Sequence, residues 1–280
     1  MQKIVFNAHY LMYFDTAIAG YWQALALPYE QSMRQLGGDL YLKKATVEFN
    51  ASARMDDRID VALACGRIGT SSMVFSGTIF RGMQPLVTGE LVYVFADPAS
   101  QTSRPVPQPL RDILLQYEAD ESMVRVEIGD WNRLGAAAAR VRTEVFVDEQ
   151  NIPTEMEWDG ADATAVHAVA WNGLAQPLAT GRLLQSQPGV ARIGRMAVVR
   201  PLRGCGVGQS VLHALLEAAV ARGDRQVLLH AQRDAESFYQ RQGFTARGEA
   251  FTEAGISHVE MFAELPLQQP RRRAGRQRDR

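Results

Sequence analysis

Three glycines at alternate positions, Gly204, Gly206 and Gly208, constrain the fold of this chain more than any other feature. They follow an apolar stretch rich in β-branched residues at 193–199, and they precede 211–220, where apolar residues recur with helical spacing. A stretch with glycine at every second residue is not ordinary helix. The pattern therefore predicts a strand, a glycine loop and a helix in succession.

Such a loop can bring its backbone close to a ligand, because glycine has no Cβ. The helix that follows presents unpaired N–H groups and the positive end of its dipole, and together these bind an anion. Arg203 adds a guanidinium that can donate two parallel hydrogen bonds to a phosphate. We therefore expect this loop to bind a pyrophosphate.

Two other kinds of phosphate loop do not fit these residues. A P-loop ends in Gly-Lys-Ser or Gly-Lys-Thr, and a Rossmann turn needs Gly-x-Gly-x-x-Gly with an acidic residue after the next strand. The strand expected at 226–230 is not followed by Asp or Glu. The spacing Arg203-x-x-Gly206-x-Gly208 instead resembles the coenzyme A loop of the GNAT superfamily of N-acetyltransferases. A tight turn that binds nothing is the plainer alternative.

Length and composition set the broad class. With 280 residues, 46% of them hydrophobic, the chain can bury two ordinary cores, so we expect two domains. A net charge of -1 gives no general attraction to nucleic acid or to an acidic membrane, and we expect neither as a partner. The two cysteines stand outside any pair motif, and no apolar run reaches about 18 residues. We therefore expect a cytoplasmic protein without a metal site.

The first 97 residues have the pattern of one helix followed by antiparallel strands. Residues 10–25 are apolar on nearly every side, which predicts a helix buried all round. Long stretches with strand character then form a predicted meander at 40–55, 58–67, 71–80 and 86–95. A sheet of long strands around a central helix is the hotdog arrangement.

The start of the chain, Ile4-Val-Phe-Asn-Ala-His-Tyr10 with Tyr13-Phe14-Asp15, resembles the segment that opens the central helix in the hydroxybenzoyl-CoA thioesterase group. The resemblance implies substrate-binding roles for Asn7 and Tyr10. The plainer alternatives are that Asn7 caps the helix and that Tyr10 packs under the sheet. One interpretation takes Asp15 as a substitute for the catalytic carboxylate of that group. The plainer one takes it as an aspartate on the helix surface.

The catalytic aspartate of that group lies at the end of a first strand, and its position here would fall before Met1. We therefore expect this strand and its carboxylate to be missing from the sequence as it stands. Thioesterase activity of the first domain is left open.

A linker follows the first domain. Four prolines in 97–109 interrupt any helix or sheet, and 110–117 has the pattern of a short amphipathic helix. Six arginines near the C-terminus, with few apolar residues between them, predict a disordered tail. The expected domain organisation is a hotdog domain at 1–97, a linker with a short helix at 98–121, a GNAT domain at 122–266 and the tail at 267–280.

The second domain begins with a predicted strand at 123–128 and a helix at 133–147. With the acidic residues that follow, they resemble the first helix pair of the GNAT subgroup that includes the ElaA-like proteins, which forms one wall of the acceptor cleft. An acidic wall attracts an ammonium group and can take its proton. Glu157, together with Glu149 and Glu155, and His167 on the next strand are the candidates. Solvated carboxylates and a packed histidine are the plainer alternatives.

The GNAT resemblance also implies a cofactor site. The strand at 226–231 would lie parallel to 196–199, and the separation between the two strands would admit the cofactor. Main-chain N–H groups of the earlier strand would then bind the pantetheine arm and polarise the acyl carbonyl. The residues that the resemblance assigns to coenzyme A are Met196, Ala197, Val198, Arg203, Gly204, Gly206 and Gly208.

A candidate catalytic residue lies further on. Phe238-Tyr239 followed by Gly243-Phe244 resembles the Phe-Tyr-x-x-x-Gly-Phe block of the same family. The resemblance implies that Tyr239 protonates the departing coenzyme A thiolate. A phenol with an ordinary pKa of about 10 is protonated at neutral pH and can do so. A core tyrosine bonded to a backbone group is the plainer alternative.

The sequence therefore predicts an α+β chain: an N-terminal hotdog domain, in which an antiparallel sheet wraps a central helix, and a C-terminal GNAT α/β domain, in which helices flank a mixed sheet. The expected activity is transfer of an acetyl group from acetyl-CoA, or of another acyl group, to an amine by direct attack and without a metal. Hotdog sheets pair edge to edge, which predicts a homo-oligomer. An acyl-CoA thioesterase, or a coenzyme A-responsive binding module without turnover, are the alternatives.

Overall fold

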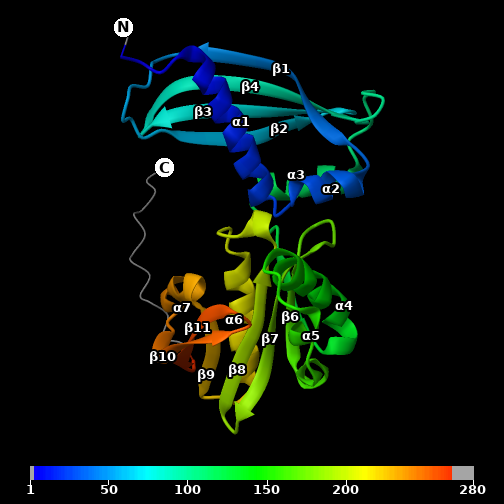
Figure 1. The fold of residues 1–280 in the computed structure, drawn as a ribbon. Coiled ribbons are helices and arrows are strands. Elements are labelled where there is room, and N and C mark those ends of the chain that lie inside the picture. Colours follow the sequence, from blue (N-terminus) through cyan, green and yellow to red (C-terminus); the bar gives the residue numbers. More distant parts are fainter. Residues whose placement is uncertain (1–2, 267–280) are drawn as a thin grey trace. The chain divides into compact units, whose positions relative to one another are not determined.

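The computed structural model of the chain describes residues 3–266, and the predicted tail at 267–280 lies outside them. The chain divides into two compact units (Figure 1). Unit 1 is Met1–Val124 with Asn172–Gln176, and unit 2 is Arg125–Trp171 with Pro177–Arg280. Within the described range, no helix has both the length and the apolar character needed to cross a membrane.

Unit 1 is a four-stranded antiparallel sheet with a long helix lying across it (Figure 1). Its strands pair in the order β1-β4-β3-β2, so the predicted meander holds for β2, β3 and β4, whereas β1 pairs with β4 instead of β2. The elements are α1 (Asn7–Ala24), α2 (Tyr29–Leu36), β1 (Asp39–Phe49), β2 (Asp60–Ile68), β3 (Ser72–Arg81), β4 (Gln84–Ala96) and α3 (Gln108–Glu118).

Helix α1 packs closely on this sheet because two glycines make room for it. Gly77 in β3 and Gly89 in β4 are paired neighbours. A Cβ on Gly77 would lie 2.6 Å from the ring of Phe14, and one on Gly89 would lie 2.8 Å from it. The fully buried Phe14 ring therefore occupies a hollow that any larger residue at either position would fill.

The expectation that this helix is buried all round is wrong. One face of α1 is buried, and it carries residues at helical spacing, among them Tyr10, Phe14 and Ile18. Leu11 and Met12 point away from the sheet, and Met12 is 53% exposed. An apolar composition thus does not decide burial when one face of the helix has no element packed on it.

Unit 2 is a seven-stranded mixed sheet with helices on both faces. The strands run in the order β10-β11-β9-β8-β7-β6-β5, with β8 and β9 parallel and all other neighbours antiparallel. The elements are β5 (Arg125–Gly129), α4 (Trp131–Arg142), η1 (Thr143–Glu149), α5 (Thr154–Glu157), η2 (Gly160–Thr164), β6 (Val166–Trp171), β7 (Pro177–Gln187), β8 (Val190–Val198), η3 (Arg200–Leu202), α6 (Val207–Arg222), β9 (Gln226–Gln232), η4 (Arg233–Ala235), α7 (Glu236–Arg241), β10 (Thr245–Glu253) and β11 (Ile256–Glu264).

Two successive residues of β7 show which helices lie on which face of this sheet. A Cβ on Gly181 would lie 2.7 Å from Leu215 of α6. Arg182, whose side chain points to the other face, bonds to Asp162 of η2 at 2.8 Å. Helix α6 and the segment around η2 therefore cover opposite faces.

The helix predicted at 133–147 forms in two parts. Helix α4 starts at Trp131, with the Asp130 carboxylate accepting a hydrogen bond from the backbone N–H of Arg133. At Thr143 the chain changes to the wider π-helical turn of η1, which carries it to Glu149. Leu134, with Ala138, Val141 and Val145, faces the core as expected.

Candidate active site

The glycine loop lies between β8 and α6, as predicted. Gly204 and Gly206 have φ values of 80° and 84°, in the left-handed region that favours glycine. No atom lies within 4 Å of the Cβ position of either residue, so the backbone here borders open space. Gly206 is the N-cap of α6, whose first turn carries no acidic residue. The loop thus presents the positive end of a 16-residue helix to any anion that enters.

Gly208 meets a different requirement. A Cβ at this position would lie 3.0 Å from Val198 and 4.0 Å from the ring of Phe238. A larger residue would push the start of α6 away from the end of β8. Gly208 therefore keeps the loop and β8 close together.

Strands β8 and β9 separate next to this loop. Their parallel pairing extends from Val190 to Ile193 on β8 and stops there, although β8 continues to Val198. At the same point, the pairing of β8 with β7 shifts in register. Strand β8 has one extra residue there, which forms a β-bulge. Arg195 lies at this bulge and has a φ of 52°. The residues after the bulge have a strand partner only in β7.

The main chain of Val198 faces the space between the separated strands. The backbone N–H of Val199 donates to Leu178 of β7 at 2.9 Å. Because successive peptide groups of a strand point in opposite directions, the N–H and C=O of Val198 point away from β7. The Val198 carbonyl accepts a hydrogen bond from Arg203 Nε at 3.0 Å. Its N–H is the donor directed into the gap.

The guanidinium of Arg203, predicted to bind phosphate, already has a partner. Its two terminal nitrogens each donate to Glu149, to Oε1 and to Oε2, both at 2.7 Å. Hydrogen bonds from Arg203 lower the pKa of the Glu149 carboxyl below its usual value. A phosphate would have to replace this carboxylate to bind Arg203. The loop pattern alone does not indicate this ion pair with Glu149.

Tyr239 lies on α7, and its ring is 7% exposed. It packs between Phe238 and Phe244, with ring centroids at 4.9 and 5.8 Å. Burial raises the pKa of the Tyr239 hydroxyl well above its ordinary value. Among the described residues this hydroxyl bonds to no backbone group, unlike the core tyrosine considered as the alternative. The phenol is therefore protonated at neutral pH.

Glu157 does not line an open acidic wall. It is buried, with Arg142 Nε donating to Oε1 and Arg195 Nε lying 3.2 Å from Oε2. Asp162 is also buried, between Arg142 and Arg182, each 2.8 Å away. These carboxylates are neutralised by arginines, so Glu157 offers no free charge to an ammonium group.

His167 belongs to the same buried cluster. It is fully buried, and Nε2 lies 2.9 Å from the Asp162 carbonyl oxygen, while Nδ1 has no partner among the described residues. Burial lowers its pKa. The ring packs against Trp131 at 4.9 Å. The plainer alternative, a packed histidine, is therefore confirmed. His167 does not reach a surface where substrate could bind.

The two candidate residues of unit 1 also differ in their surroundings. Tyr10 is buried, and its hydroxyl accepts a hydrogen bond from the backbone N–H of Ala53 at 2.7 Å. Asn7 is the exposed first residue of α1, and the N-cap is Phe6, which has no capping side chain. The interpretation of Asn7 as the cap of the helix is therefore wrong. The interpretation of Tyr10 as a packed side chain is confirmed.

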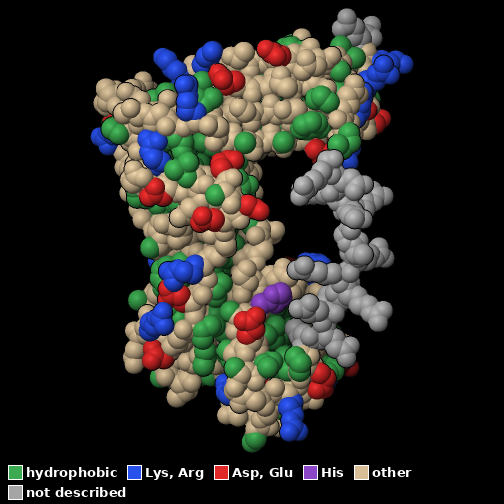
Figure 2. Space-filling view, turned by 180° about the vertical axis from the view of Figure 1, so that it is seen from behind, with side chains coloured by type: hydrophobic (Ala, Val, Ile, Leu, Met, Phe, Trp, Pro, Cys, Tyr) green, Lys and Arg blue, Asp and Glu red, His purple; other side chains and the backbone are tan. Residues whose placement is uncertain are grey.

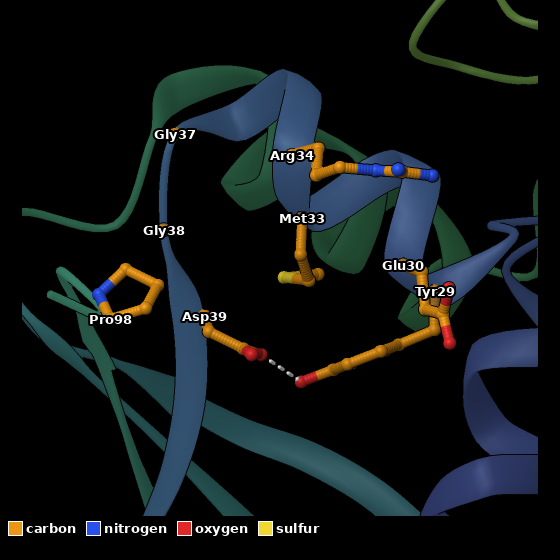
Figure 3. A pocket seen from close by; sticks show the side chains of 8 residues that line it. All are labelled: Tyr29, Glu30, Met33, Arg34, Gly37, Gly38, Asp39 and Pro98. Atoms are coloured by element: carbon orange, nitrogen blue, oxygen red, sulfur yellow. Dashed lines mark hydrogen bonds between the residues drawn. The ribbon is translucent and has the colours of Figure 1, made fainter.

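Unit 1 contains a cavity of about 420 Å³ away from these two residues. Figure 3 shows Tyr29 and Asp39 meeting across it, with the Tyr29 hydroxyl donating to Asp39 Oδ1 at 2.6 Å. Arg34 extends away from this pair (Figure 3). The cavity is lined by Tyr29, Glu30, Met33, Arg34, Gly37, Gly38, Asp39 and Pro98.

The charged groups on the surface are mixed. Figure 2 shows basic and acidic side chains interspersed over the face in view. Such a surface fits the net charge of -1.

The folds and the loop together define a class: a two-domain α+β protein, in which a mixed sheet carries a glycine loop at a helix N-terminus beside a separated pair of parallel strands. Comparison with family models makes this more specific. Residues 133–265 match the acetyltransferase (GNAT) domain, and residues 2–88 match the thioesterase superfamily.

Two curated relatives and one solved structure are similar to part of this chain. The chain is 36% identical over 125 residues to the uncharacterized N-acetyltransferase YjcF of Bacillus subtilis, and the match covers 44% of this chain and 88% of that protein. It is 36% identical over 134 residues to the protein ElaA of Escherichia coli, covering 46% and 86% respectively. A putative N-acetyltransferase from Lactobacillus plantarum, of known crystal structure, covers 51% of this chain with a TM-score of 0.49 and 29% identity, over 99% of its own length. The chain belongs to the GNAT acetyltransferase family through its second half, and residues 2–88 of its first half match the thioesterase superfamily.

Proposed function

We propose that this GNAT enzyme transfers an acetyl group from acetyl-CoA directly to the nitrogen of an amine. The observation that carries the proposal is the conjunction of two features at one end of β8. The loop at Gly204 and Gly206 has open space above a helix N-terminus, and the β8–β9 gap opens beside it. An extended ligand with a pyrophosphate at one end and a thioester at the other fits this arrangement.

The binding geometry follows from these donors. Backbone N–H groups at the start of α6 would hold the pyrophosphate, because they have no partner within the helix. The N–H of Val198, directed into the gap, would bind the carbonyl oxygen of the acetyl group. Negative charge develops on that oxygen when the amine attacks, so a fixed donor there stabilises the transition state more than the ground state.

Tyr239 would complete the reaction as a general acid. When the carbon–sulfur bond breaks, the electron pair stays on sulfur, and the resulting thiolate takes a proton from the phenol. Helix α7 is near the glycine loop, since Phe238 lies 4.0 Å from the Cβ position of Gly208. Burial of the phenol, which keeps it protonated, supports this role.

The test is release of free coenzyme A thiol from acetyl-CoA, with and without a panel of primary amines. Release that depends on the amine supports transfer. Release without any amine would favour hydrolysis by the thioesterase-superfamily half, and binding of acetyl-CoA without release would favour a sensor. Arg203→Glu should abolish binding, because it places a carboxylate beside the pyrophosphate and beside Glu149. A variant that binds normally would remove Arg203 from the site.

The identity of the amine, a homo-oligomeric state through the first half, and a cytoplasmic location stay predictions. Size-exclusion chromatography with light scattering on the full chain tests the oligomeric state: a monomer at micromolar concentration would refute it.

A further inference from the structure

The bulge in β8 places two residues, Arg195 and Met196, opposite a single residue of β7, Gly181. Their side chains lie on opposite faces of the sheet. Met196 lies on the α6 face, because a Cβ on Gly181 would be 2.4 Å from its sulfur and 2.7 Å from Leu215 of α6. Arg195 lies on the other face, where its guanidinium contacts Asp159, the N-cap of η2. The bulge therefore directs the Arg195 side chain toward the segment around η2.

The backbone of Arg195 is in a conformation that arginine seldom adopts. Its φ is 52°, in the left-handed region. Glycine is the usual residue with this conformation in a bulge, because a Cβ disfavours it. A residue other than glycine keeps such a backbone only where its surroundings hold it there. Arg195 therefore needs contacts that maintain the bulge.

The side chain of Arg195 provides such contacts. Its Nε lies 3.2 Å from Glu157 Oε2, and one terminal nitrogen donates to the Glu157 carbonyl oxygen at 3.2 Å. The same nitrogen donates to the Met156 carbonyl oxygen and to Asp159 Oδ2, both at 3.4 Å. The Arg195 side chain is 23% exposed, so solvent screens these contacts less than it would on an open surface. Arg195 is therefore joined to α5 and to the start of η2.

The groups that bind Arg195 are themselves fixed. Glu157 is buried, and Arg142 of α4 donates to its carboxylate and, at 3.0 Å, to its carbonyl oxygen. The two carboxylate oxygens of Asp159 accept hydrogen bonds from Arg182 of β7 at 2.7 and 2.9 Å. Helix α4 and strand β7 therefore both fix the position of the Arg195 guanidinium.

The bulge sets the direction of the main-chain groups that follow it in β8. With the bulge, the N–H of Val199 donates to Leu178 of β7, and the N–H of Val198 points into the β8–β9 gap. Without the bulge, the residues after Arg195 would shift by one position against β7, and the Val198 N–H would turn toward β7. The conformation of Arg195 thus decides whether this donor faces the gap.

We propose that Arg195 is a positioning residue for acetyl transfer: anchored on Glu157 and Asp159, it maintains the bulge that directs the Val198 N–H to the acyl carbonyl. This inference rests on the proposed function and assigns the side chain that fixes one of its donors. Arg195 acts through the backbone, because α5 and Asp159 engage its guanidinium. A fixed donor stabilises the transition state because it does not reorient as charge develops on the oxygen.

The experiment compares wild type, Arg195→Ala and Arg195→Gly in amine-dependent thiol release. Both substitutions remove the same ion pairs, but glycine adopts a φ of 52° without strain and alanine does not. Arg195→Ala should lower kcat by about 100-fold, the low end of what loss of one oxyanion donor costs. Arg195→Gly should lower it by only about 10-fold, because the bulge keeps its preferred conformation without the anchor. Acetyl-CoA affinity should not change, since the glycine loop binds the pyrophosphate.

Two further variants serve as controls. Arg192→Ala is the matched control, because Arg192 is an exposed arginine of the same strand and lies before the bulge. It should behave as wild type. Arg195→Lys retains the charge but has a single nitrogen for the anchor, so its kcat should lie between those of wild type and Arg195→Ala. Circular dichroism checks that each variant is folded before its rate is measured.

Each outcome decides a different claim. Equal kcat values for Arg195→Gly and Arg195→Ala overturn this inference and leave the proposed function standing. Wild-type rates in both Arg195→Gly and Arg195→Lys overturn it as well, even where Arg195→Ala does not fold. Weaker acetyl-CoA binding with an unchanged kcat would assign Arg195 to the cofactor site instead. No amine-dependent release by wild type overturns the proposed function, and the role of Arg195 with it.

Discussion

The buried charge cluster of unit 2 gives the sharpest stability prediction, through Arg142→Met. Arg142 is 1% exposed and lies with its guanidinium 4.5 Å above the ring of Trp158. It donates to Asp162 Oδ1 at 2.8 Å and to the carbonyl oxygen of Glu157 at 3.0 Å, besides the Glu157 carboxylate. Methionine preserves much of the volume but leaves two buried carboxylates with one cation fewer.

The expected loss is about 3 kcal/mol, at the lower end of what removal of one partner from a buried ion pair costs. The lower end applies because Glu157 keeps Arg195 and Asp162 keeps Arg182. The assay is urea unfolding of the full chain, followed by tryptophan fluorescence, in which the transition of unit 2 is compared between variants. Trp131 and Trp158 both lie against Arg142 and report on this unit.

Arg140→Met is the matched control, since Arg140 is exposed on the same helix. It should leave the transition where it is. The double variant Arg142→Met with Glu157→Gln should recover part of the loss, because it removes a carboxylate that lacks its partner. Equal midpoints for Arg140→Met and Arg142→Met would refute the reasoning.

Three further predictions concern the proposed site and the charges behind it. Glu149→Gln should tighten acetyl-CoA binding, because it releases the Arg203 guanidinium from its carboxylate partner. A calorimetric titration measures the affinity. Weaker binding by the variant would show that Glu149 helps to hold the cofactor. Tyr239→Phe should lower kcat by about 100-fold while sparing acetyl-CoA affinity, as expected for loss of a general acid; an unchanged rate removes it from the mechanism. Hydrogen bonds from Arg182 hold the pKa of Asp159 at about 2, below its unfolded value of about 3.9, so its stabilising effect is present above about pH 4 and is lost as the pH falls toward 2. Unfolding midpoints of wild type should therefore fall between about pH 4 and pH 2 more steeply than those of Asp159→Asn, and parallel curves would count against this ion pair.

Much of the fold was predictable because the sequence patterns are local. Alternation and turn residues indicate β1 to β4, and the glycine loop between β8 and α6 follows from spacing alone. Helix α2 (Tyr29–Leu36) was not predicted. It is short and packs only in part, with Ser32 and Met33 buried, so it carries little periodic signal, although Gly37 ends it in a left-handed turn.

The candidate site was predictable only in part, because charge pairing depends on tertiary contacts. In the sequence, Glu157 is one carboxylate of an acidic stretch. Its arginine partners are Arg142 on α4, 15 residues away, and Arg195 at the bulge in β8, 38 residues away. The separation of β8 and β9 shows the converse. The family resemblance implies it, but the residues at which the pairing stops, Ile193 and Leu229, appear only in the strand register.

The central claim is that the loop at Gly206 binds acetyl-CoA, and calorimetric titration of the full chain tests it most directly. Gly206→Ala would be compared with Gly82→Ala, since both glycines have positive φ and open space at the Cβ position, but only Gly206 borders the proposed site. We expect saturable binding by wild type and Gly82→Ala, and much weaker binding by Gly206→Ala, because the added Cβ strains the loop and enters the space for the pyrophosphate. Absence of binding by wild type, or equal affinity for the two variants, would contradict the claim.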